Sequence, residues 1–325
     1  MSDLILDTEA VELCQKKIKL LQNNVSQLLV GQDEVLEQII IVLLAGGHVL
    51  LEGVPGLGKT LMIRALAESI DIDYKRVQFT PDLMPADVTG HSMLNMSSGK
   101  FEIRKGPAFT HLLLADEINR APAKTQAALL EVMQEYQITI DGQSYALDLP
   151  FMVMATQNPI DNEGTYPLPE AELDRFMMKV QVNYPSLTDE VSLTLANTTS
   201  ISQSIKKPLD KVLDIQDIQY LRQAAAHVIV DEKIVEYAVS IVRASREWNG
   251  IAHGAGVRAS IALIQTAKVK ALMQGYDFVM PEQIQNMVLP VLRHRIILSA
   301  EQEISGGSIE QVLTDIINKV PVPRQ

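Results

Sequence analysis

The stretch "GVPGLGKT", residues 53–60, could bind phosphate. It fits the pattern G-x-x-x-x-G-K-[ST], follows an apolar run and opens a helical pattern. Glycines there let the backbone wrap closely around phosphate oxygens, Lys59 would neutralise the outer phosphates, and Thr60 could ligate magnesium. The alternative is a chance glycine turn. Because a strand and a helix flank the loop, the pattern favours a nucleotide phosphate site.

Two adjacent acids, Asp116 and Glu117, end the apolar run in "LLLADEINRAP". They could simply be the solvated exit of a buried strand, which would need no ligand. Next to a phosphate loop, however, two acids indicate a role in metal binding and hydrolysis. We expect Asp116 to hold a nucleotide-bound Mg²⁺, through water, and Glu117 to position and polarise the water that attacks the γ-phosphate.

Short apolar runs must position these residues. They are "HVLLE" from His48, "YKRVQF" from Tyr74, "HLLLADE" from His111, "FMVMATQN" from Phe151 and "RFMMKVQV" from Arg175. Most are too continuous for half-exposed strands, and helical stretches such as "TLMIRALAESI" and "AKTQAALLEVMQEY" lie between them. The pattern predicts an α/β fold with a parallel sheet covered on both faces by helices.

Other segments flank or interrupt this pattern. An apolar stripe of Val11, Cys14, Ile18, Leu21, Val25 and Leu28 predicts an N-terminal helix, and a second helix follows from about Asp33. "SMLNMSSGKFEIR" and "ITIDGQSYALDL" are predicted as hairpins inserted into the sheet pattern.

The second half of the chain reads as helical. Helices are predicted over residues 216–227, 232–248, 260–274 and 281–294, and the end from about Gly306 is weakly patterned. We therefore expect two domains: an α/β nucleotide-binding core over residues 1–186, and an all-helical lid over residues 187–325.

Composition limits the partners and the compartment. The 40 acids exceed the 28 bases, and the net charge of -12 disfavours nucleic acid and anionic membranes as partners. The single cysteine, Cys14, is expected in the core and excludes an internal disulfide. The acidic N-terminus is unlike a signal peptide, and "IIIVLLA" is shorter than the ~18 residues of a spanning helix. We expect a cytoplasmic protein without stable membrane insertion.

Three further groups have two interpretations each. The six histidines show no paired metal-ligand spacing, so packing or surface roles are expected. The cluster Arg293, His294 and Arg295 is expected to be a solvated helix end, with an interface contact as the alternative. Met84, Met93, Met96 and Phe101 could form an adaptable contact surface, or they could pack under the first hairpin.

Taken together, these motifs resemble those of the MoxR family of AAA+ ATPases. The resemblance rests on "VGQDEV", "LLEGVPGLGKT", "QFTPDLMPADVTG", "LLLADEINRAPAKTQAALLEVMQE", "ATQNP", "EGTYPLPEAELDRF" and "LRHRI", which span most of the sequence. It implies ATP and Mg²⁺ as cofactors, with Asp116 and Glu117 as Walker B, Asn158 as sensor 1, Arg175 as the arginine finger and Arg258 as sensor 2. It also implies two groups of nucleotide-binding residues. Near the adenine these are Val30, Gly31 and Gln32. In and directly after Walker A they are Gly53, Val54, Pro55, Gly56, Leu57, Gly58, Lys59, Thr60 and Leu61.

The implied roles of three residues can be weighed against simpler ones. Asn158 could reach phosphate and water from the sheet edge, or it could cap a turn before Pro159. Arg175 could reach a neighbouring subunit's γ-phosphate, or it could form a surface ion pair with Glu172. Arg258 falls near a helix start, where the macrodipole disfavours a cation unless an anion binds there. Whether it would serve its own subunit or a neighbour stays open.

The resemblance implies a ring of identical subunits, six in number, that converts ATP hydrolysis into remodelling of a partner protein. Typical partners in the family carry a von Willebrand factor A domain, and typical roles are protein maturation and cofactor insertion. Two alternatives remain open from the residues: a nucleotide-dependent binding switch and a nucleic-acid motor.

Overall fold

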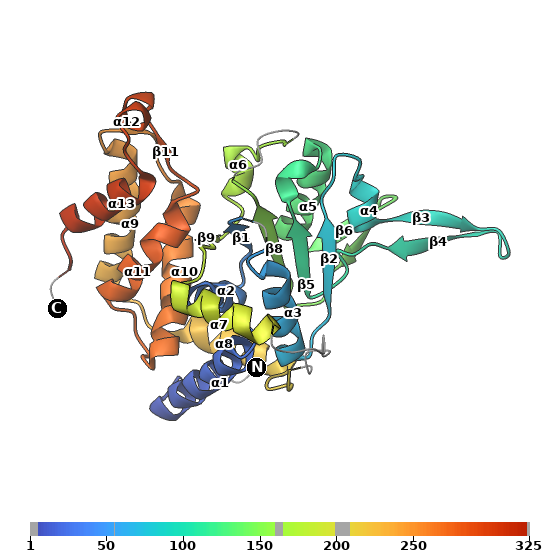
Figure 1. Ribbon diagram of the computed structural model, residues 1–325, viewed down its shortest axis with the longest axis horizontal. Helices are drawn as coiled ribbons and strands as arrows, with labels where there is room; N and C mark the ends of the chain where they lie inside the picture. Colours follow the sequence, from blue (N-terminus) through green and yellow to red (C-terminus); the bar gives the residue numbers. More distant parts are fainter. Residues whose placement is uncertain (1–5, 55, 160–164, 199–208, 324–325) are drawn as a thin grey trace.

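The computed structural model describes residues 6–54, 56–159, 165–198 and 209–323. Its centre is a five-stranded sheet in the order β2 (Tyr74–Gln78), β5 (Leu112–Asp116), β8 (Met152–Gln157), β1 (Val49–Glu52) and β9 (Met178–Gln181). Every neighbouring pair runs parallel (Figure 1). The parallel sheet predicted from the five apolar runs is confirmed.

The strand register brings the chemistry-bearing ends together. Ala115 of β5 pairs with Ala155 of β8, and Glu52 of β1 pairs with Gln157 of β8. In parallel strands the carboxyl ends meet at one edge of the sheet. The loop after β1, the acids that end β5 and the residue after β8 therefore share that edge.

Helices cover both faces of the sheet. One face packs on α2 (Asp33–Ala45) and α3 (Lys59–Ile70), with α1 (Thr8–Ser26) outside them. The other packs on α5 (Ala123–Glu135) and the short α4 (Pro85–Thr89). Strand side chains alternate between the two cores, because successive residues of a strand point to opposite faces. Leu112 and Leu114 join the first core, and Leu113 and Ala115 join the second.

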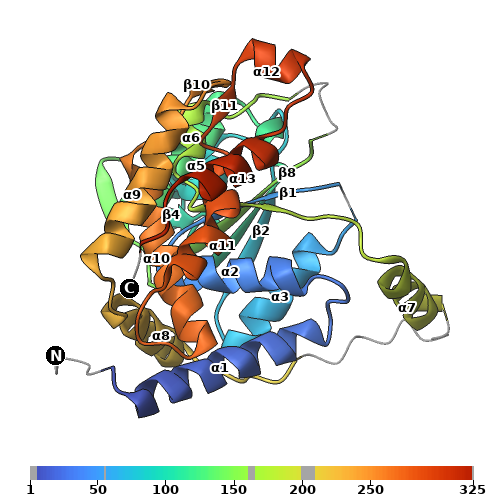
Figure 2. The same ribbon diagram turned by 90° about the vertical axis from the view of Figure 1, so that its left-hand side faces the viewer.

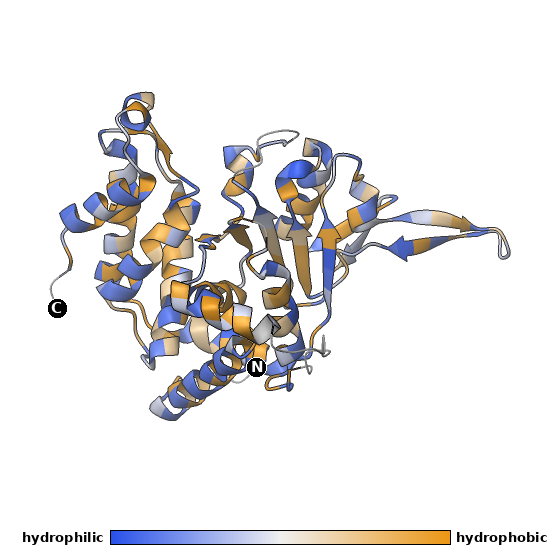
Figure 3. Cartoon of the chain, viewed as in Figure 1, coloured by the Kyte–Doolittle hydropathy of each residue, from blue (hydrophilic) through white to orange (hydrophobic). Residues whose placement is uncertain are grey.

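Two hairpins stand outside the main sheet, as predicted. They are β3 (Gly90–Asn95) with β4 (Lys100–Lys105), and β6 (Gln137–Ile140) with β7 (Gln143–Ala146). The first hairpin projects away from the body, and hydrophobic residues lie on both of its strands (Figure 3). Met84, Met93, Met96 and Phe101 are 63%, 52%, 88% and 75% exposed, so the alternative in which they pack under the hairpin is wrong.

The C-terminal part is helical, apart from a small strand pair. It contains α8 (Ile215–His227), α9 (Glu232–Glu247), α10 (Val257–Gln274), α11 (Pro281–Leu292), α12 (Ala300–Ile304) and α13 (Ile309–Lys319), with β10 (Ile251–His253) paired to β11 (Ile297–Leu298). Helix α10 begins three residues before the predicted Ser260, because Gly256 takes an extended N-cap conformation. Sequence patterning missed α13, which buries Val312, Leu313 and Ile316.

Four further helices in the described part of the chain were not predicted: α4 and α12, given above, and α6 and α7. Helix α6 (Glu170–Leu173) precedes β9 and is a single turn. Helix α7 (Leu187–Thr198) follows β9 and stands away from the body in Figure 2. Its Leu187, Val191 and Leu195 are all exposed, so the apolar spacing there does not mark a buried face.

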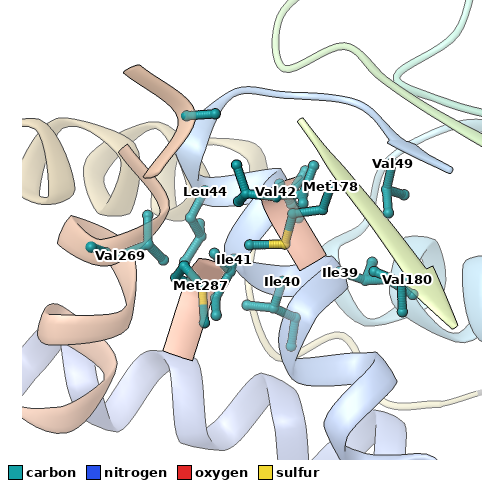
Figure 4. Close-up of a cluster of buried hydrophobic side chains, with 14 of the residues drawn as sticks. Ile39, Ile40, Ile41, Val42, Leu44, Val49, Met178, Val180, Val269 and Met287 are labelled. Carbon is teal, nitrogen blue, oxygen red and sulfur yellow. The ribbon is translucent and has the colours of Figure 1, made fainter. Parts of the chain in front are cut away.

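A continuous apolar core joins the C-terminal helices to the sheet. Helix α2 lies between the two: Figure 4 shows Ile39 to Val42 and Leu44 of α2 among Met178 and Val180 of β9, Val269 of α10 and Met287 of α11. Cys14 of α1 is fully buried in the same core, as expected, and burial raises the pKa of its thiol to about 11. No helix in the described part of the chain is long and apolar enough to cross a membrane.

The basic cluster after α11 is not a solvated helix end. His294 and Arg295 are 7% and 8% exposed, although Arg293 is only partly buried. The expectation fails because the chain turns inward after α11 and places both side chains against the segment before β9. Their contact is an interface within the molecule, between the C-terminal helices and the α/β core.

Candidate functional site

A cavity of ≈ 250 Å³ opens at the carboxyl edge of the sheet. It is lined by residues of four strands or their following loops: Gly53, Gly56, Gly58, Lys59, Thr60, Arg76, Gln78, Asp116, Glu117, Thr156 and Asn158. Most of these come from the phosphate-loop pattern, the paired acids and the asparagine singled out in the sequence. The parallel strand order brings them together across separations of up to 105 residues.

The loop between β1 and α3 has the backbone that a phosphate cradle needs. Gly56 and Gly58 have φ of 87° and 80°, a region that favours glycine, and a Cβ at either would meet no atom within 4 Å. Gly53 differs, because a Cβ there would lie 2.4 Å from the Val182 carbonyl oxygen. Pro55 lies outside the described residues.

Lys59 begins α3 at the base of the cavity. Its Nζ donates a hydrogen bond to the carbonyl oxygen of Gly53. Burial lowers the pKa of Lys59, and the carboxylates of Asp116, Glu117 and Glu52 oppose that shift. A cation held between a phosphate loop and two acids can neutralise a phosphate and remain paired within the site.

Asp116 is held by two neighbouring strands. Its Oδ1 accepts a 2.6 Å hydrogen bond from the Thr156 hydroxyl of β8. Its Oδ2 accepts from Nη2 and Nε of Arg76 on β2, at 2.6 and 3.1 Å. The carboxylate is thus oriented into the cavity lined by Thr60.

Glu117 has a left-handed backbone conformation, with φ of 56° and ψ of 51°. Its N–H donates to Thr156 Oγ1 at 2.8 Å, and its Oε2 accepts from Gln78 Nε2 at 2.8 Å and lies 3.2 Å from Arg120 Nε. Such backbone outliers in non-glycine residues cost ~1–3 kcal/mol and cluster at functional sites. This conformation changes the chain direction directly after Asp116, and both acids line the cavity.

The donor set fits a magnesium nucleotide. Mg²⁺ takes hard oxygen ligands, and a hydroxyl from Thr60 and a carboxylate from Asp116 line the same space. The open surface at Gly56 and Gly58 leaves room for phosphate oxygens beside the N-terminus of α3.

Three lining residues were missed by sequence analysis: Arg76, Gln78 and Thr156. A signal existed for the first two. In "YKRVQF" polar residues alternate with Val77, so one face of this strand is polar, unlike the continuous apolar strands beside it. Thr156 gave no signal, because a threonine is ordinary in a strand.

The remaining expected nucleotide contacts lie around the cavity and beside it. Asn158 follows β8, is half-buried and lines the main cavity. Gly31 and Gln32 line a second cavity of ≈ 270 Å³ with Asn183 and Arg293, and Gln32 Nε2 donates to the Asn183 carbonyl at 3.3 Å. Val30, Val54, Leu57 and Leu61 are partly buried, and Leu57 and Leu61 pack against the main core.

Arg175 does not line the phosphate cavity. It lies between α6 and β9, and its Nη1 donates a 2.7 Å hydrogen bond to the Leu130 carbonyl oxygen of α5. The expected alternative was an ion pair with Glu172. Within the described ranges, Oε2 of Glu172 is buried with no hydrogen-bond partner, and burial raises the pKa of this acid despite the nearby Arg175.

Arg258 also lies away from the phosphate cavity, in the first turn of α10. Its side chain is 57% exposed, and Nη1 lies 3.7 Å from Oδ2 of Asp174. Asp174 immediately precedes Arg175. The structure therefore brings Arg175 and Arg258 near one another, through Asp174, and does not bring either to this chain's own phosphate loop.

Comparison with known proteins agrees with the fold. Two family models match: the ATPase family associated with various cellular activities (AAA) over residues 48–178, and the AAA lid domain over residues 243–316. YeaC of Bacillus subtilis is 44% identical over 93% of both chains. Chaperone MoxR1 of Mycobacterium tuberculosis is 40% identical over 92% of this chain and 81% of its own.

A solved structure shows the same architecture. It is a protein of Cytophaga hutchinsonii, with a TM-score of 0.89, 40% identity, and coverage of 97% of this chain and 98% of that one. The matched residues include the phosphate loop, the paired acids and the helical C-terminal part. The chain belongs to the MoxR family of AAA+ ATPases.

Proposed function

We propose that this protein binds ATP with Mg²⁺ in the cavity at the carboxyl edge of the sheet and hydrolyses it to ADP and phosphate. The observation that carries the proposal is that Lys59, Thr60, Asp116, Glu117 and Asn158 line one cavity. Gly53 to Leu61 would cradle the phosphates, with Lys59 neutralising their charge. Thr60 and Asp116 would hold the metal, which when bound neutralises phosphate oxygens as the bond breaks.

Glu117 is the proposed general base or orienter of the attacking water. Its carboxylate sits beside the metal-binding acid but is held by different partners, Gln78 and Arg120. Asn158, which follows the neighbouring strand β8 and lines the same cavity, would hydrogen-bond both the phosphate and the water. The second cavity, at Gly31 and Gln32, is the proposed place of the adenine.

The protein is proposed to act as a ring of identical subunits, six by family resemblance. Arg175 and Arg258 support this proposal, because both lie away from this chain's own phosphate cavity. An arginine that completes the nucleotide site of a neighbouring subunit must lie away from the nucleotide site of its own subunit. Arg175 is the proposed arginine finger for the next subunit, and Arg258 the proposed sensor for nucleotide.

The work of the ring is proposed to be the remodelling or maturation of partner proteins, including proteins with a von Willebrand factor A domain. The naming of the relative MoxR1 as a chaperone supports this. The exposed Met93, Met96 and Phe101 on the projecting hairpin offer an adaptable contact surface of the kind that such work needs.

Mixed rings test the proposal. Glu117→Gln should keep ATP binding and lose turnover by ~10²–10⁴-fold, and Arg175→Ala should bind ATP and lose ~10³–10⁵-fold. A mixture of the two should regain turnover, because some interfaces pair an intact Arg175 with an intact Glu117. Glu131→Gln, on the exposed side of α5, is the matched control and should turn over normally.

Two results would contradict the proposal. One is near-normal turnover by Glu117→Gln. The other is a mixture that stays inactive although labelled subunits demonstrably co-assemble. The partner-protein role is tested separately, by whether a purified von Willebrand factor A protein raises the ATP turnover of the wild-type ring.

A further inference from the structure

Arg295 is buried at the junction between the helical lid and the α/β core. It follows α11, it is 8% exposed, and all five N–H groups of its guanidinium have acceptors. Four of its five hydrogen bonds go to the short segment from Asp174 to Met177, and the fifth goes to Val291 of the preceding helix α11. An arginine used in this way fixes a backbone, because its donors form a rigid planar fork.

The contacts surround Arg175 on both sides. Nε of Arg295 donates to Oδ1 of Asp174 at 2.7 Å, and Nη2 donates to the carbonyl oxygens of Asp174 and Phe176 at 3.2 and 2.7 Å. Nη1 donates to the Met177 carbonyl at 3.1 Å. The residues before and after Arg175 are thus held from the lid.

The neighbouring His294 adds a bond to the same segment. Its Nε2 donates to the Phe176 carbonyl oxygen at 2.9 Å, while the Phe176 ring is fully buried in the core under the sheet. Burial lowers the pKa of His294, and the adjacent Arg295 lowers it further, so the imidazole is neutral. Of these two residues, only Arg295 therefore brings a positive charge to residues 174–177.

Asp174 connects this arrangement to a second lid helix. Its Oδ1 faces Arg295, and its Oδ2 lies 3.7 Å from Arg258 in the first turn of α10. The carboxylate of Asp174 thus lies between Arg258, the proposed sensor, and Arg295, which binds the backbone on both sides of Arg175. The contact with Arg295 is short and comes from a buried side chain, whereas the contact with Arg258 is longer and partly exposed. Arg295 is therefore the main link between the lid and residues 174–177.

We propose that Arg295 is a positioning residue for Arg175: from the lid it fixes the backbone of residues 174–177, so that Arg175 can reach a neighbouring subunit's nucleotide. The inference rests on the proposed function, in which Arg175 acts on the next subunit. Arg295 itself touches no substrate. Its loss leaves the phosphate loop, Asp116 and Glu117 of the same chain intact.

Subunit mixtures separate this role from a general structural one. Arg295→Lys keeps the charge beside Asp174 but lacks the donors for the four-bond clamp. Turnover of the homogeneous variant should fall about 10²-fold, the usual cost of misplacing a reacting group by about 1 Å. Its affinity for a fluorescent ATP analogue should stay at the wild-type value, because its own nucleotide site is unchanged.

The two mixtures should give opposite results. With Glu117→Gln subunits, which supply an intact Arg175, the Arg295→Lys subunits should regain turnover. With Arg175→Ala subunits they should not, because neither parent supplies a correctly placed finger. A purely structural defect would fail equally in both mixtures, and it would lower ATP affinity or thermal stability.

Arg222→Lys is the matched control. Arg222 is another partly buried lid arginine that binds a core carbonyl, with Nε 2.9 Å from the Leu43 oxygen, but it contacts α2 and not residues 174–177. It should keep normal turnover alone. If Arg295→Lys does not fold, Asp174→Asn weakens the same clamp more gently and is scored in the same two mixtures.

The inference is overturned if Arg295→Lys turns over like the wild type, or if it stays inactive with Glu117→Gln while Arg175→Ala is rescued by that same partner. The proposed function fails in a different way: Arg175→Ala is then itself active, or is not rescued by co-assembled Glu117→Gln. The two failures are therefore distinguishable in one set of assays.

Discussion

Arg76 forms an ion pair with Asp116, the carboxylate proposed to hold magnesium, with Nη2 2.6 Å from Oδ2. The pair joins two neighbouring parallel strands at the mouth of the phosphate cavity. Arg76 and a water bound to the metal would both donate hydrogen bonds to this carboxylate, so they compete for it. The ion pair with Arg76 therefore opposes magnesium binding at Asp116.

Arg76→Gln should lower the Mg²⁺ concentration needed for tight ATP binding. Arg76 is 47% exposed, so the pair contributes ~0–1 kcal/mol and the gain is at most about fivefold. The check is to titrate a fluorescent ATP analogue at buffered magnesium concentrations. An unchanged magnesium requirement together with weaker ATP binding would instead place Arg76 on the phosphates.

Lys59→Ala and Asp116→Ala should fail at binding rather than at hydrolysis. Under the proposed function each removes a charge that faces the phosphates or their metal, and a hydrogen bond to a charged group contributes ~1.5–3 kcal/mol. Calorimetry should show magnesium-ATP affinity about 10- to 100-fold weaker. Lys124→Ala, an exposed lysine at the start of α5, serves as the control. Wild-type affinity in both variants would contradict this order of events.

Gly53→Ala should destabilise the folded protein. A Cβ there lies 2.4 Å from the Val182 carbonyl oxygen, a backbone atom that cannot move aside cheaply. Forcing atoms into a packed interior typically costs ~1–3 kcal/mol. Gly256→Ala, with open space around its Cβ and an ordinary φ of -80°, should change the free energy of unfolding by less than about 1 kcal/mol. Equal denaturation midpoints for the two variants would refute the packing argument.

His48 should make the protein sensitive to acid. Its Nδ1 accepts from the Val153 N–H at 3.0 Å and its Nε2 donates to the Met133 carbonyl at 3.0 Å, so the folded state holds a neutral ring. Burial lowers its pKa from 6.5 to about 4. Because the unfolded chain takes up this proton first, stability present above pH 6.5 is lost as the pH falls towards 4.

The free energy of unfolding should fall by about 3 kcal/mol through His48 alone, since one pKa unit corresponds to 1.36 kcal/mol. Denaturant titrations between pH 7 and pH 4 should show it as proton uptake on unfolding. His48→Gln should flatten the pH dependence by one proton, even though it lowers stability at pH 7. His227→Gln, at an exposed histidine at the end of α8, is the control for removing a histidine from the chain. An identical slope in the wild type and His48→Gln would refute the assignment.

Local sequence determined the sheet strands, the phosphate loop and the positions of the paired acids. Each depends on short-range physics: a continuous apolar run must be buried, and a glycine loop before a helix can wrap phosphate. The family resemblance singled out Asn158, and its position at the end of an apolar run placed it at the edge of the sheet. Helix α13 escaped prediction although Val312, Leu313 and Ile316 lie on one buried face, since three apolar residues are a weak signal without the surface that covers them.

Only the tertiary structure decided which side chains meet across strands and domains. Thr156, Arg76 and Gln78 join the acids because β5 lies between β8 and β2, an order that no local pattern encodes. The sequence predicted that Arg295 is exposed to solvent, because lysine and arginine are rarely buried without a partner. Its partners, Asp174 and the carbonyls of Phe176 and Met177, lie about 120 residues earlier in the chain and approach only when the lid packs on the core. Burial of a charge depends on such distant partners, whereas burial of an apolar run depends mainly on the run itself.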